Sequence, residues 1–283
     1  MPARRMFVVI SAIVLIIAAC GGGGGAGATG GDMLARIKKD GVIRVGTDPN
    51  YAPQSFQKSD GTFDGFDVAV ANEIAKRLGV TAKFETPDFS VVEAGNWADR
   101  FDISVGSMTI TEKRKGVLDF TEPYYYTPAQ MAAIKDIGIT TLDGLAGKKV
   151  CVGEATTYYE WLTGTLKLGD GSALAPVPAG AEALTQKTDQ DCAQSVKSGR
   201  RDADGWLSSS TTVQQAIDAG TPYITVGDPV FYEPLAVATD KAAPPHAELQ
   251  AELNRIVTEM HTDGTLSALS KQWFNGQDLT TKQ

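Results

Sequence analysis

The sequence contains few of the side chains that bind transition metals. Its 283 residues include two histidines and three cysteines. A structural zinc site usually needs four His, Cys or acidic ligands at close spacing. His246 and His261 show no such spacing and lie far along the chain from the cysteines. We therefore expect no metal ion, and nothing in the sequence indicates another cofactor.

An excess of positive charge is also missing. The chain has 26 Lys and Arg against 34 Asp and Glu, a formal net charge of −8. Proteins that bind nucleic acid normally carry a basic surface, so this balance argues against nucleic acid as a partner. An acidic surface mainly favours solubility.

Only one long apolar run is present. Arg4 and Arg5 precede residues 6–19, which form a shorter run than the roughly 20 residues that span a membrane. This layout predicts a secretory signal at residues 1–19. The run ends in Ala18-Ala19-Cys20 and resembles the cleavage box of bacterial lipoproteins, in which the cysteine becomes the lipidated first residue. The alternative is an ordinary signal peptide that ends near a cysteine.

The next segment cannot form a core. Residues 21–31 are nearly all glycine and alanine, so we interpret 20–32 as a flexible tether. About 250 residues follow, enough for one large or two modest domains. We expect a single monomeric body outside the cytoplasm, held at the membrane by lipid on Cys20. In that compartment Cys151 and Cys192 are expected to form a disulfide; two buried free thiols are the alternative.

The body alternates strands and helices. In the first half we predict strands at 42–47, 81–85 and 101–105, short helices at 33–39 and 91–97, and a longer helix that opens at Gly65-Phe66-Asp67 and ends before Gly79. This order indicates a mostly parallel sheet with both faces covered. The second half repeats the rhythm, with predicted strands at 149–152, 174–177, 203–207, 223–226 and 235–239, and helices at 157–166, 190–198, 211–219, 247–261 and 265–273.

Two extended stretches interrupt this rhythm. Residues 120–134 and 227–234 are rich in aromatic residues and proline and poor in helix formers. We interpret them as crossings between two lobes, one of residues 33–126 and 232–283 and the other of residues 127–231. Lobes joined in this way enclose a cleft and close on a ligand by hinge motion.

The stretch after the third strand, Gly106 to Arg114, carries groups suited to a small anion. Arg114 offers paired N–H donors for a carboxylate, Ser107 and Thr109 offer hydroxyls, and Gly106 allows close approach of the backbone. The alternative is a Ser/Thr-rich turn that caps a helix beginning near Lys113, with Arg114 solvated.

Motifs along the whole body resemble the bacterial extracellular solute-binding proteins of family 3, receptors that supply polar amino acids to ABC importers. The likeness rests on the order and spacing of many short pieces. They are Val45-Gly46-Thr47-Asp48, Gly65-Phe66-Asp67-Val68, Gly106-Ser107-Met108-Thr109-Ile110-Thr111 with Arg114, Asp119-Phe120-Thr121-Glu122-Pro123-Tyr124-Tyr125, Leu145-Ala146-Gly147-Lys148, Ala155-Thr156-Thr157, Ser198-Gly199-Arg200 and Asp263-Gly264-Thr265. The resemblance implies an α/β, two-lobed periplasmic-binding-protein-like fold (type II), with two hinge crossings and the ligand cleft between the lobes.

The resemblance also implies roles for single residues. Arg114 would clamp the ligand α-carboxylate with help from Thr109, and Ser107 would contact the amino-acid head. Thr156 and Thr157 would meet the same carboxylate at a helix N-terminus, where free N–H groups and the helix dipole favour an anion.

Three further positions would contact the ligand side chain. The aromatic rings of Tyr51 and Phe89 would sandwich it, and Asp48 would face a polar or cationic group. Both rings are alternatively ordinary core aromatics, and Asp48 is alternatively a turn former beside Pro49.

The sequence departs from the family at the carboxylate that binds the ligand ammonium. That position, on the loop after the predicted strand 203–207, falls on Leu207. A buried ammonium needs a counter-charge. Asp204 and Glu154 are the candidate substitutes, and Trp206 offers a cation–π contact.

We therefore predict a binding receptor, not an enzyme, whose partners are an amino acid, preferentially cationic or glutamine-like, and an ABC permease. Two alternatives remain. One is an enzyme that resembles prephenate or arogenate dehydratases, with Glu154 as general acid. The other is a sensory receptor that presents its ligand to a membrane protein.

Overall fold

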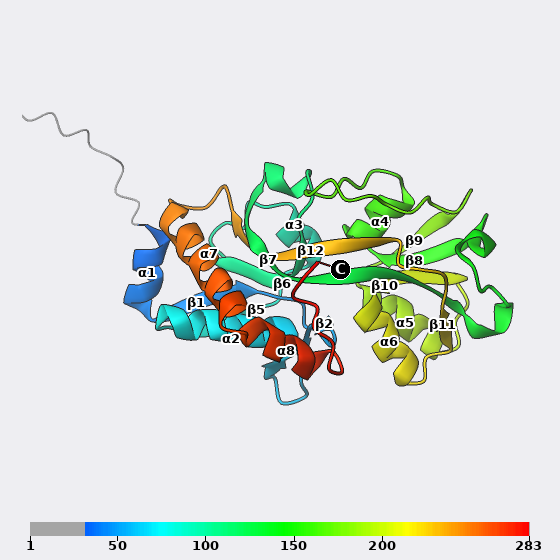
Figure 1. Ribbon diagram of the computed structural model, residues 1–283, viewed down its shortest axis with the longest axis horizontal. Coiled ribbons are helices and arrows are strands. Elements are labelled where there is room, and N and C mark those ends of the chain that lie inside the picture. The colour runs from blue at the N-terminus through cyan, green and yellow to red at the C-terminus, as the bar shows by residue number, and fades with distance from the viewer. Residues whose placement is uncertain (1–31, 283) are drawn as a thin grey trace, which may run out of the picture. The chain divides into compact units, whose positions relative to one another are not determined.

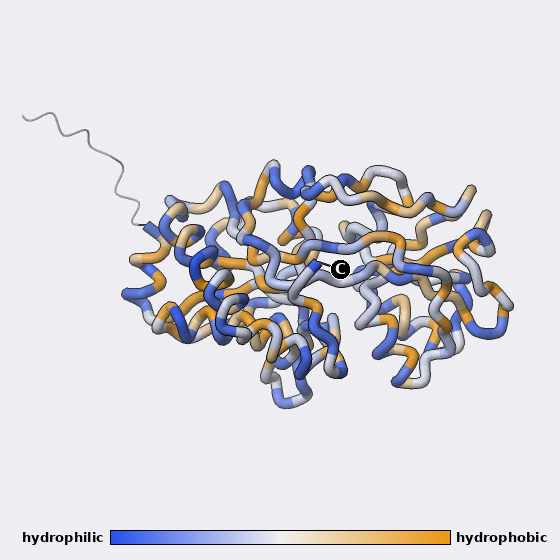
Figure 2. The backbone as a smooth tube through the Cα atoms, in the orientation of Figure 1, coloured by the Kyte–Doolittle hydropathy of each residue, from blue (hydrophilic) through white to orange (hydrophobic). Residues whose placement is uncertain are grey.

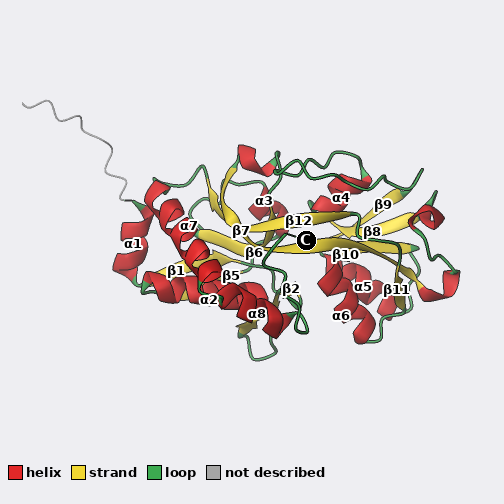
Figure 3. Ribbon diagram, in the orientation of Figure 1, coloured by secondary structure: helices red, strands yellow, loops and turns green. Residues whose placement is uncertain are grey.

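The computed structural model describes residues 32–282, and a nine-stranded sheet runs through them (Figure 1). Helices lie on both faces of this sheet (Figure 3), which confirms the predicted α/β class. In spatial order the strands are β5 (Thr81–Glu85), β1 (Val42–Gly46), β6 (Ile103–Thr109), β12 (Phe231–Asp240), β7 (Leu118–Ile134), β10 (Gly205–Ser209), β8 (Lys149–Gly153) and β9 (Glu182–Gln186), and β11 (Tyr223–Thr225) pairs with β7.

Lobe 1 is the part of the chain that surrounds the first large hydrophobic core. Strands β5 and β6 both pair in parallel with β1. Helix α2 (Phe66–Leu78) buries Val70, Ile74 and Leu78 on one face and ends at Gly79, whose φ of 75° suits glycine. Four other helices belong to this lobe: α1 (Met33–Asp40), α7 (Ala247–Thr262) and α8 (Thr265–Trp273) in the same core, and α3 (Phe89–Glu93) in a smaller cluster with Trp97 and Phe101.

Lobe 2 has β8 at its centre, with β9 and β10 both parallel to it. Successive residues of β8 face opposite sides of the sheet, as in any strand. Val150 and Val152 pack with α4 (Thr157–Leu162), whereas Cys151 packs with α5 (Asp189–Lys197) and α6 (Ser210–Asp218). Figure 2 shows hydrophobic segments along these central strands.

Two long strands connect the lobes. β7 and β12 pair antiparallel from Phe231 opposite Ala129 to Asp240 opposite Leu118. Strand β7 pairs with β10 of lobe 2 at one end, and β12 pairs with β6 of lobe 1 at the other. The two predicted crossings are therefore neighbouring strands of one sheet. The boundaries given above for the lobes remain a prediction.

Several elements differ from the sequence prediction. The expected strand at 174–177 is wrong, because this segment is irregular and the strand is β9, five residues beyond it. Pro176 and Pro178 lack the N–H that a strand ladder requires. The strand expected at 203–207 is Gly205–Ser209, and Phe89 begins a helix instead of preceding one. Only a short 3-10 turn, Arg114–Gly116, follows Lys113.

The remaining regular structure is small. A three-stranded sheet of β2 (Asn50–Tyr51), β3 (Ser55–Gln57) and β4 (Phe63–Asp64) was not predicted. Two further 3-10 turns are at Lys135–Ile137 and Leu142–Leu145. Between residues 32 and 282, no helix has both the length and the apolarity to span a bilayer. The predicted signal, Cys20 and almost all of the tether lie outside the described residues.

Candidate functional site

A cavity of about 40 Å³ lies between the lobes, and ten of the twelve predicted ligand-binding residues line it. The two exceptions are Asp204 and Leu207. The carboxyl ends of parallel strands β1, β6, β8 and β9, or the turns after them, supply most of the wall, as expected for ligand sites in α/β folds. The lining residues are Asp48, Tyr51, Phe89, Gly106, Ser107, Thr109, Arg114, Glu154, Thr156, Thr157, Tyr158, Lys187, Thr188, Asp189 and Glu233.

Arg114 is the most deeply buried cation of this cavity, with 1% of its surface exposed. Its Nη1 donates to the carbonyl oxygen of Thr109 and its Nη2 to that of Ala155, both at 3.1 Å. Its Cζ lies 5.2 Å from the centroid of the Phe89 ring. Nε lies 3.7 Å from Oε2 of Glu93, an ion pair without a hydrogen bond, and has no hydrogen-bond partner among residues 32–282. The guanidinium is thus oriented by contacts with both lobes while part of its donor capacity remains unused, and the alternative of a solvated Arg114 is excluded.

The turn between β8 and α4 faces Arg114. Ala155 has a φ of 60°, a left-handed conformation that is uncommon for a residue with a side chain, and its carbonyl oxygen meets Arg114. Thr156 caps α4 by accepting a hydrogen bond from Tyr159 N. Strained backbone of this kind often occurs at binding sites.

A carboxylate of the protein lies where the ligand carboxylate was expected. Oε1 of Glu233, on β12, accepts hydrogen bonds from the hydroxyls of Thr109, at 2.7 Å, and Thr157. Oε2 accepts a bond from Tyr158, also at 2.7 Å. Burial raises the pKa of Glu233, while these hydroxyls and the Arg114 charge act in the opposite direction. Glu233 therefore bridges lobe 1 and lobe 2 through the same hydroxyls that the sequence assigned to the ligand.

Ser107 is on the cavity wall, but its hydroxyl points into lobe 1. The residue has a φ of 54°, and its Oγ donates to Asp67 Oδ2 at 2.7 Å. Asp67 also accepts a bond from Tyr124, and burial raises the pKa of this carboxyl to about 7. The backbone N–H of Ser107 donates to the hydroxyl of Tyr124 at 3.2 Å, so its N–H and its hydroxyl are both engaged within lobe 1.

Aromatic rings form two sides of the cavity. Phe89 packs against Arg114, and Tyr51 lies opposite Tyr158, with 3.2 Å between their hydroxyl oxygens. These two tyrosines come from different lobes. Tyr51 and Phe89 both line the cavity, and their sandwich of a ligand side chain stays a prediction.

The cavity also collects acidic side chains. Asp48 accepts a bond from Asn50 N at 2.7 Å, and burial raises its pKa. Asp189 is 6% exposed and accepts a bond from Gly153 N at 2.8 Å. Burial, together with the charges of Glu233 and Asp48, raises the pKa of Asp189 to about 7, despite the opposing effect of the Gly153 N–H. Glu154 lies at the exposed rim.

Three residues that the sequence connected with the ligand ammonium are not at the cavity: Leu207, where the family carboxylate is missing, and the candidates Asp204 and Trp206. Leu207 is fully buried in the lobe 2 core and pairs with Met131 of β7. Asp204 lies before β10, at the opposite end of the strand, where it contacts Lys149 N. Trp206 is fully buried against Tyr223. The error has a structural reason, because β10 extends two residues further than predicted, to Ser209.

The turn that does follow β10 carries no carboxylate. Ser209 caps α6 and accepts a bond from Nε2 of Gln54 in lobe 1, at 2.9 Å. Gln54 also donates to Thr211 at 2.7 Å and accepts a bond from Thr212 at 3.1 Å. This turn therefore holds the lobes together but offers no counter-charge to an ammonium.

Sequence reasoning missed five lining residues. Glu233 falls in a predicted crossing, and Tyr158 follows the Thr156-Thr157 pair directly. Lys187, Thr188 and Asp189 follow β9, which was expected elsewhere. The sequence did contain a signal for the start of α5, and hence for the turn before it. Thr188 and Asp191 have the spacing of a capping box, and in the structure they form one.

The sequence of the chain is similar to those of known binding proteins. The family model described as bacterial extracellular solute-binding proteins, family 3, matches residues 43–276. The L-cystine-binding protein TcyJ of Escherichia coli (strain K12) is 32% identical over 252 residues, which are 88% of this chain and 88% of that protein.

Solved structures of amino-acid-binding proteins are also similar to this chain. An ancestral arginine-binding protein bound to arginine superimposes with a TM-score of 0.70 at 28% identity, covering 83% of this chain and 98% of that one. The ancestral amino acid-binding protein AncCDT-1, described as a precursor of cyclohexadienyl dehydratase, gives a TM-score of 0.72 at 30% identity, covering 85% and 99%.

Proposed function

The chain belongs to the bacterial extracellular solute-binding proteins of family 3, and from this membership we propose that it captures an amino acid in the cleft and delivers it to an ABC importer. The observation that carries the proposal is Arg114, a buried guanidinium at the cavity wall with unused donor capacity. Arginine is the side chain best suited to hold a carboxylate.

Closure of the lobes is the proposed mechanism. The contacts of Arg114 with Ala155, and of Tyr51 with Tyr158, join lobe 1 to lobe 2. The cavity of about 40 Å³ holds only about three water molecules at roughly 10–15 Å³ each. A solute must therefore enter when the lobes part, and it shifts the equilibrium if it binds the closed form more tightly. We assign residues 33–126 and 232–283 to one moving body and 127–231 to the other.

The charges of the cavity favour a cationic amino acid. Asp48, Glu154, Asp189 and Glu233 supply four carboxylates, against the cations of Arg114 and Lys187. Lys187 is already paired with Asp88 at 2.6 Å. A ligand with an additional positive group would offset the excess, whereas glutamate would increase it. Arginine and lysine are the preferred candidates, and glutamine stays in the test.

Lipid anchoring through Cys20 is part of the proposal and rests on the lipoprotein-like sequence Ala18-Ala19-Cys20. Expression in a bacterium fed radiolabelled palmitate tests it. We expect label in the wild-type protein and none in Cys20→Ala. Equal labelling of both would contradict the anchor.

We also propose that the chain is not an enzyme. The similar proteins reported above are named as binding proteins, although AncCDT-1 is described as a precursor of a dehydratase. Buried carboxyls with raised pKa values, as found for Asp189 and Glu233, occur in acid–base catalysis too. Incubation with prephenate distinguishes a binding protein from a dehydratase. We expect no product. Turnover by the wild-type protein that is abolished in Glu233→Gln would establish an enzyme.

A thermal-shift screen tests the function as a whole. Residues 32–283 are unfolded and refolded to remove carried-over solute, then mixed with the common amino acids, L-cystine, polyamines and betaines. A ligand at 100 times its dissociation constant stabilises by about 2.7 kcal/mol. A shift with arginine or lysine is expected. The absence of a shift with every amino acid would contradict the proposal.

A further inference from the structure

The ammonium group of a bound amino acid requires a counter-charge that the turn after β10 does not provide. We propose that Asp189, the first residue of α5, is the carboxylate that receives this ammonium. The proposal rests on the amino-acid receptor function and names the residue that completes the recognition of the ligand head. It replaces Asp204 and Glu154, the two substitutes that the sequence suggested for the carboxylate missing at Leu207.

The position of Asp189 leaves an acceptor free. Its Oδ1 takes one hydrogen bond, from Gly153 N at 2.8 Å. The hydroxyl of Ser208, at the end of β10, also acts on the carboxylate and lowers its pKa. An ionised carboxylate accepts about four such bonds. Asp189 lines the cavity, so its carboxylate retains acceptor capacity at the cavity wall.

The place along the wall also fits an α-ammonium. Gly153, which binds Asp189, is two residues before Ala155, which binds Arg114. One short turn therefore contacts both the buried anion and the buried cation. In an α-amino acid the ammonium and the carboxylate are on adjacent atoms, so both groups of the ligand head must be satisfied close together.

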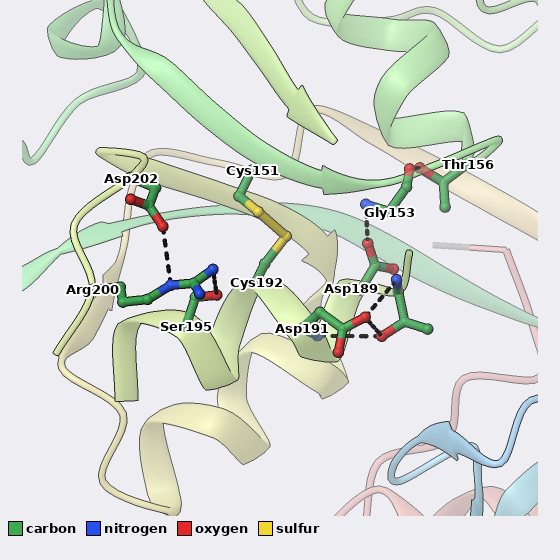
Figure 4. Close-up of a disulfide and its surroundings, with 10 residues drawn as sticks. Cys151, Gly153, Thr156, Asp189, Asp191, Cys192, Ser195, Arg200 and Asp202 are labelled. Carbon is green, nitrogen blue, oxygen red and sulfur yellow. Dashed lines mark hydrogen bonds and ion pairs between the residues drawn. A yellow bond between two sulfur atoms is a disulfide. The ribbon is translucent and has the colours of Figure 1, made fainter. Parts of the chain in front are cut away.

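The structure fixes Asp189 firmly. Figure 4 shows the disulfide between Cys151 of β8 and Cys192 of α5, two residues before Gly153 and three residues after Asp189. A side chain at position 153 would place its Cβ only 2.9 Å from Asp189 Oδ1, so the close approach requires glycine. The Thr188 and Asp191 capping box holds the start of the same helix. Such rigidity is what a specific binding residue needs.

The other cavity carboxylates are less suited. Glu233 already accepts bonds from three hydroxyls, and Asp48 accepts one from Asn50 in its own turn. Glu154 is exposed to solvent at the rim. Asp189 is buried, as Glu233 is, but accepts one backbone hydrogen bond where Glu233 accepts three from hydroxyls, and it is less exposed than Asp48 and Glu154.

Electrostatics give an independent readout. Burial raises the pKa of Asp189 most, and the carboxylates of Glu233 and Asp48 raise it further, whereas the Gly153 N–H and the Ser208 hydroxyl lower it. The pKa of about 7 means that a bound ammonium, which favours the ionised form, displaces a proton near neutral pH. Ligand binding should therefore release protons at pH 7.

The test compares two probes by isothermal titration calorimetry. One is L-arginine, and the other is 5-guanidinopentanoic acid, which is arginine without the α-amino group. The wild-type protein, Asp189→Asn and the matched control Asp204→Asn are titrated at pH 7 in two buffers that differ in ionisation enthalpy. Thermal unfolding of each variant confirms that it is folded.

We expect Asp189→Asn to lose at least about 30-fold in affinity for arginine and less than about threefold for the analogue, with proton release abolished. Asp204→Asn should behave as wild type. An equal loss for both probes, or a loss specific to arginine in Glu233→Gln but not in Asp189→Asn, would overturn the assignment. If the wild-type protein binds no amino acid, the proposed function itself fails, which is a distinct outcome.

Discussion

Two turns of lobe 2 occupy similar positions in the fold but make different contacts. The turn after β8 and the turn after β10 both follow parallel strands of one sheet and lead into helices capped by a hydroxyl, Thr156 in one and Ser209 in the other. The first faces the cavity and contacts Arg114 and Asp189. The second is occupied by Gln54 of lobe 1.

The difference shows that a shared position at the carboxyl edge of a sheet does not determine function. What decides is whether the polar groups of the turn are already satisfied within the protein. Around the first turn, Arg114 Nε makes no hydrogen bond to residues 32–282, and Asp189 accepts a single backbone hydrogen bond, from Gly153 N. At the second, Ser209 and Thr212 are bonded to Gln54 and to each other.

The largest expected effect comes from cutting the covalent link that only the first turn has. The disulfide between Cys151 and Cys192 spans 41 residues, a loop length for which chain entropy predicts about 4 kcal/mol of stabilisation. Cys151→Ala with Cys192→Ala should lose that amount in urea unfolding. It should also weaken arginine binding, because Asp189 is then held less firmly. Unchanged stability would contradict the structural role of the link.

A pH-dependent effect should follow at Asp189. Its pKa is raised from 3.8 to about 7 in the folded protein. Below about pH 4 the carboxyl is neutral in both the folded and the unfolded state and does not affect stability. As pH rises towards 7, the unfolded state ionises more readily, so the wild-type folded state becomes less stable; above pH 7 this loss is constant. Without ligand, the unfolding free energy of Asp189→Asn relative to wild type should rise by about 4 kcal/mol between pH 4 and pH 8, at 1.36 kcal/mol per pKa unit. Urea unfolding at both pH values measures this. A constant difference would show that the carboxyl is not buried as described.

An intermediate effect is expected at Glu233, which competes with a ligand carboxylate for Thr109 and Thr157. Removing its charge in Glu233→Gln should strengthen binding of 5-guanidinopentanoic acid by about tenfold, roughly 1.4 kcal/mol, because like charges no longer oppose each other. Arginine should change less, since its ammonium loses a favourable neighbour. Calorimetry measures both, with Glu154→Gln at the exposed rim as the control. Weaker binding of the analogue would contradict competition.

The smallest effects are expected for single hydroxyl deletions, one in each of the two turns. Thr157→Val removes a hydroxyl at the cavity. It should weaken the binding of arginine by about 1 kcal/mol and leave the binding of agmatine, which lacks the carboxylate, unchanged. Ser209→Ala removes the α6 cap and should cost about 1 kcal/mol of stability. Because it also loosens the contact with Gln54, it should weaken both ligands equally. Selective loss of arginine in Ser209→Ala would erase the distinction between the turns.

Much of lobe 1 could be predicted because its signals are local. The apolar spacing of α2, its stop at Gly79 and the alternation of strands with helices need no knowledge of distant contacts. The Gly106 to Arg114 stretch and the Thr156-Thr157 pair were likewise readable, since each combines residues of matching chemistry within a few positions.

The missing parts of the site have a common cause. The apolar residues at 174–177 suggested a strand although Pro176 lies within it, so the true strand β9 and the turn after it were overlooked. Asp189 was lost with that turn. Glu233 was missed for another reason, because its three hydrogen-bond donors come from segments 75 to 124 residues away in sequence. Such long-range pairing has no local signature.

The most direct test of the account is the affinity of refolded residues 32–283 for the amino acid that stabilises them most, measured for wild type, Arg114→Ala and the surface control Arg200→Ala. Removing one partner of a buried charge pair typically costs 2–5 kcal/mol. We therefore predict a loss of at least about 30-fold in Arg114→Ala and none in Arg200→Ala. An unchanged affinity in a folded Arg114→Ala protein would mean that the cavity between the lobes does not bind the ligand carboxylate.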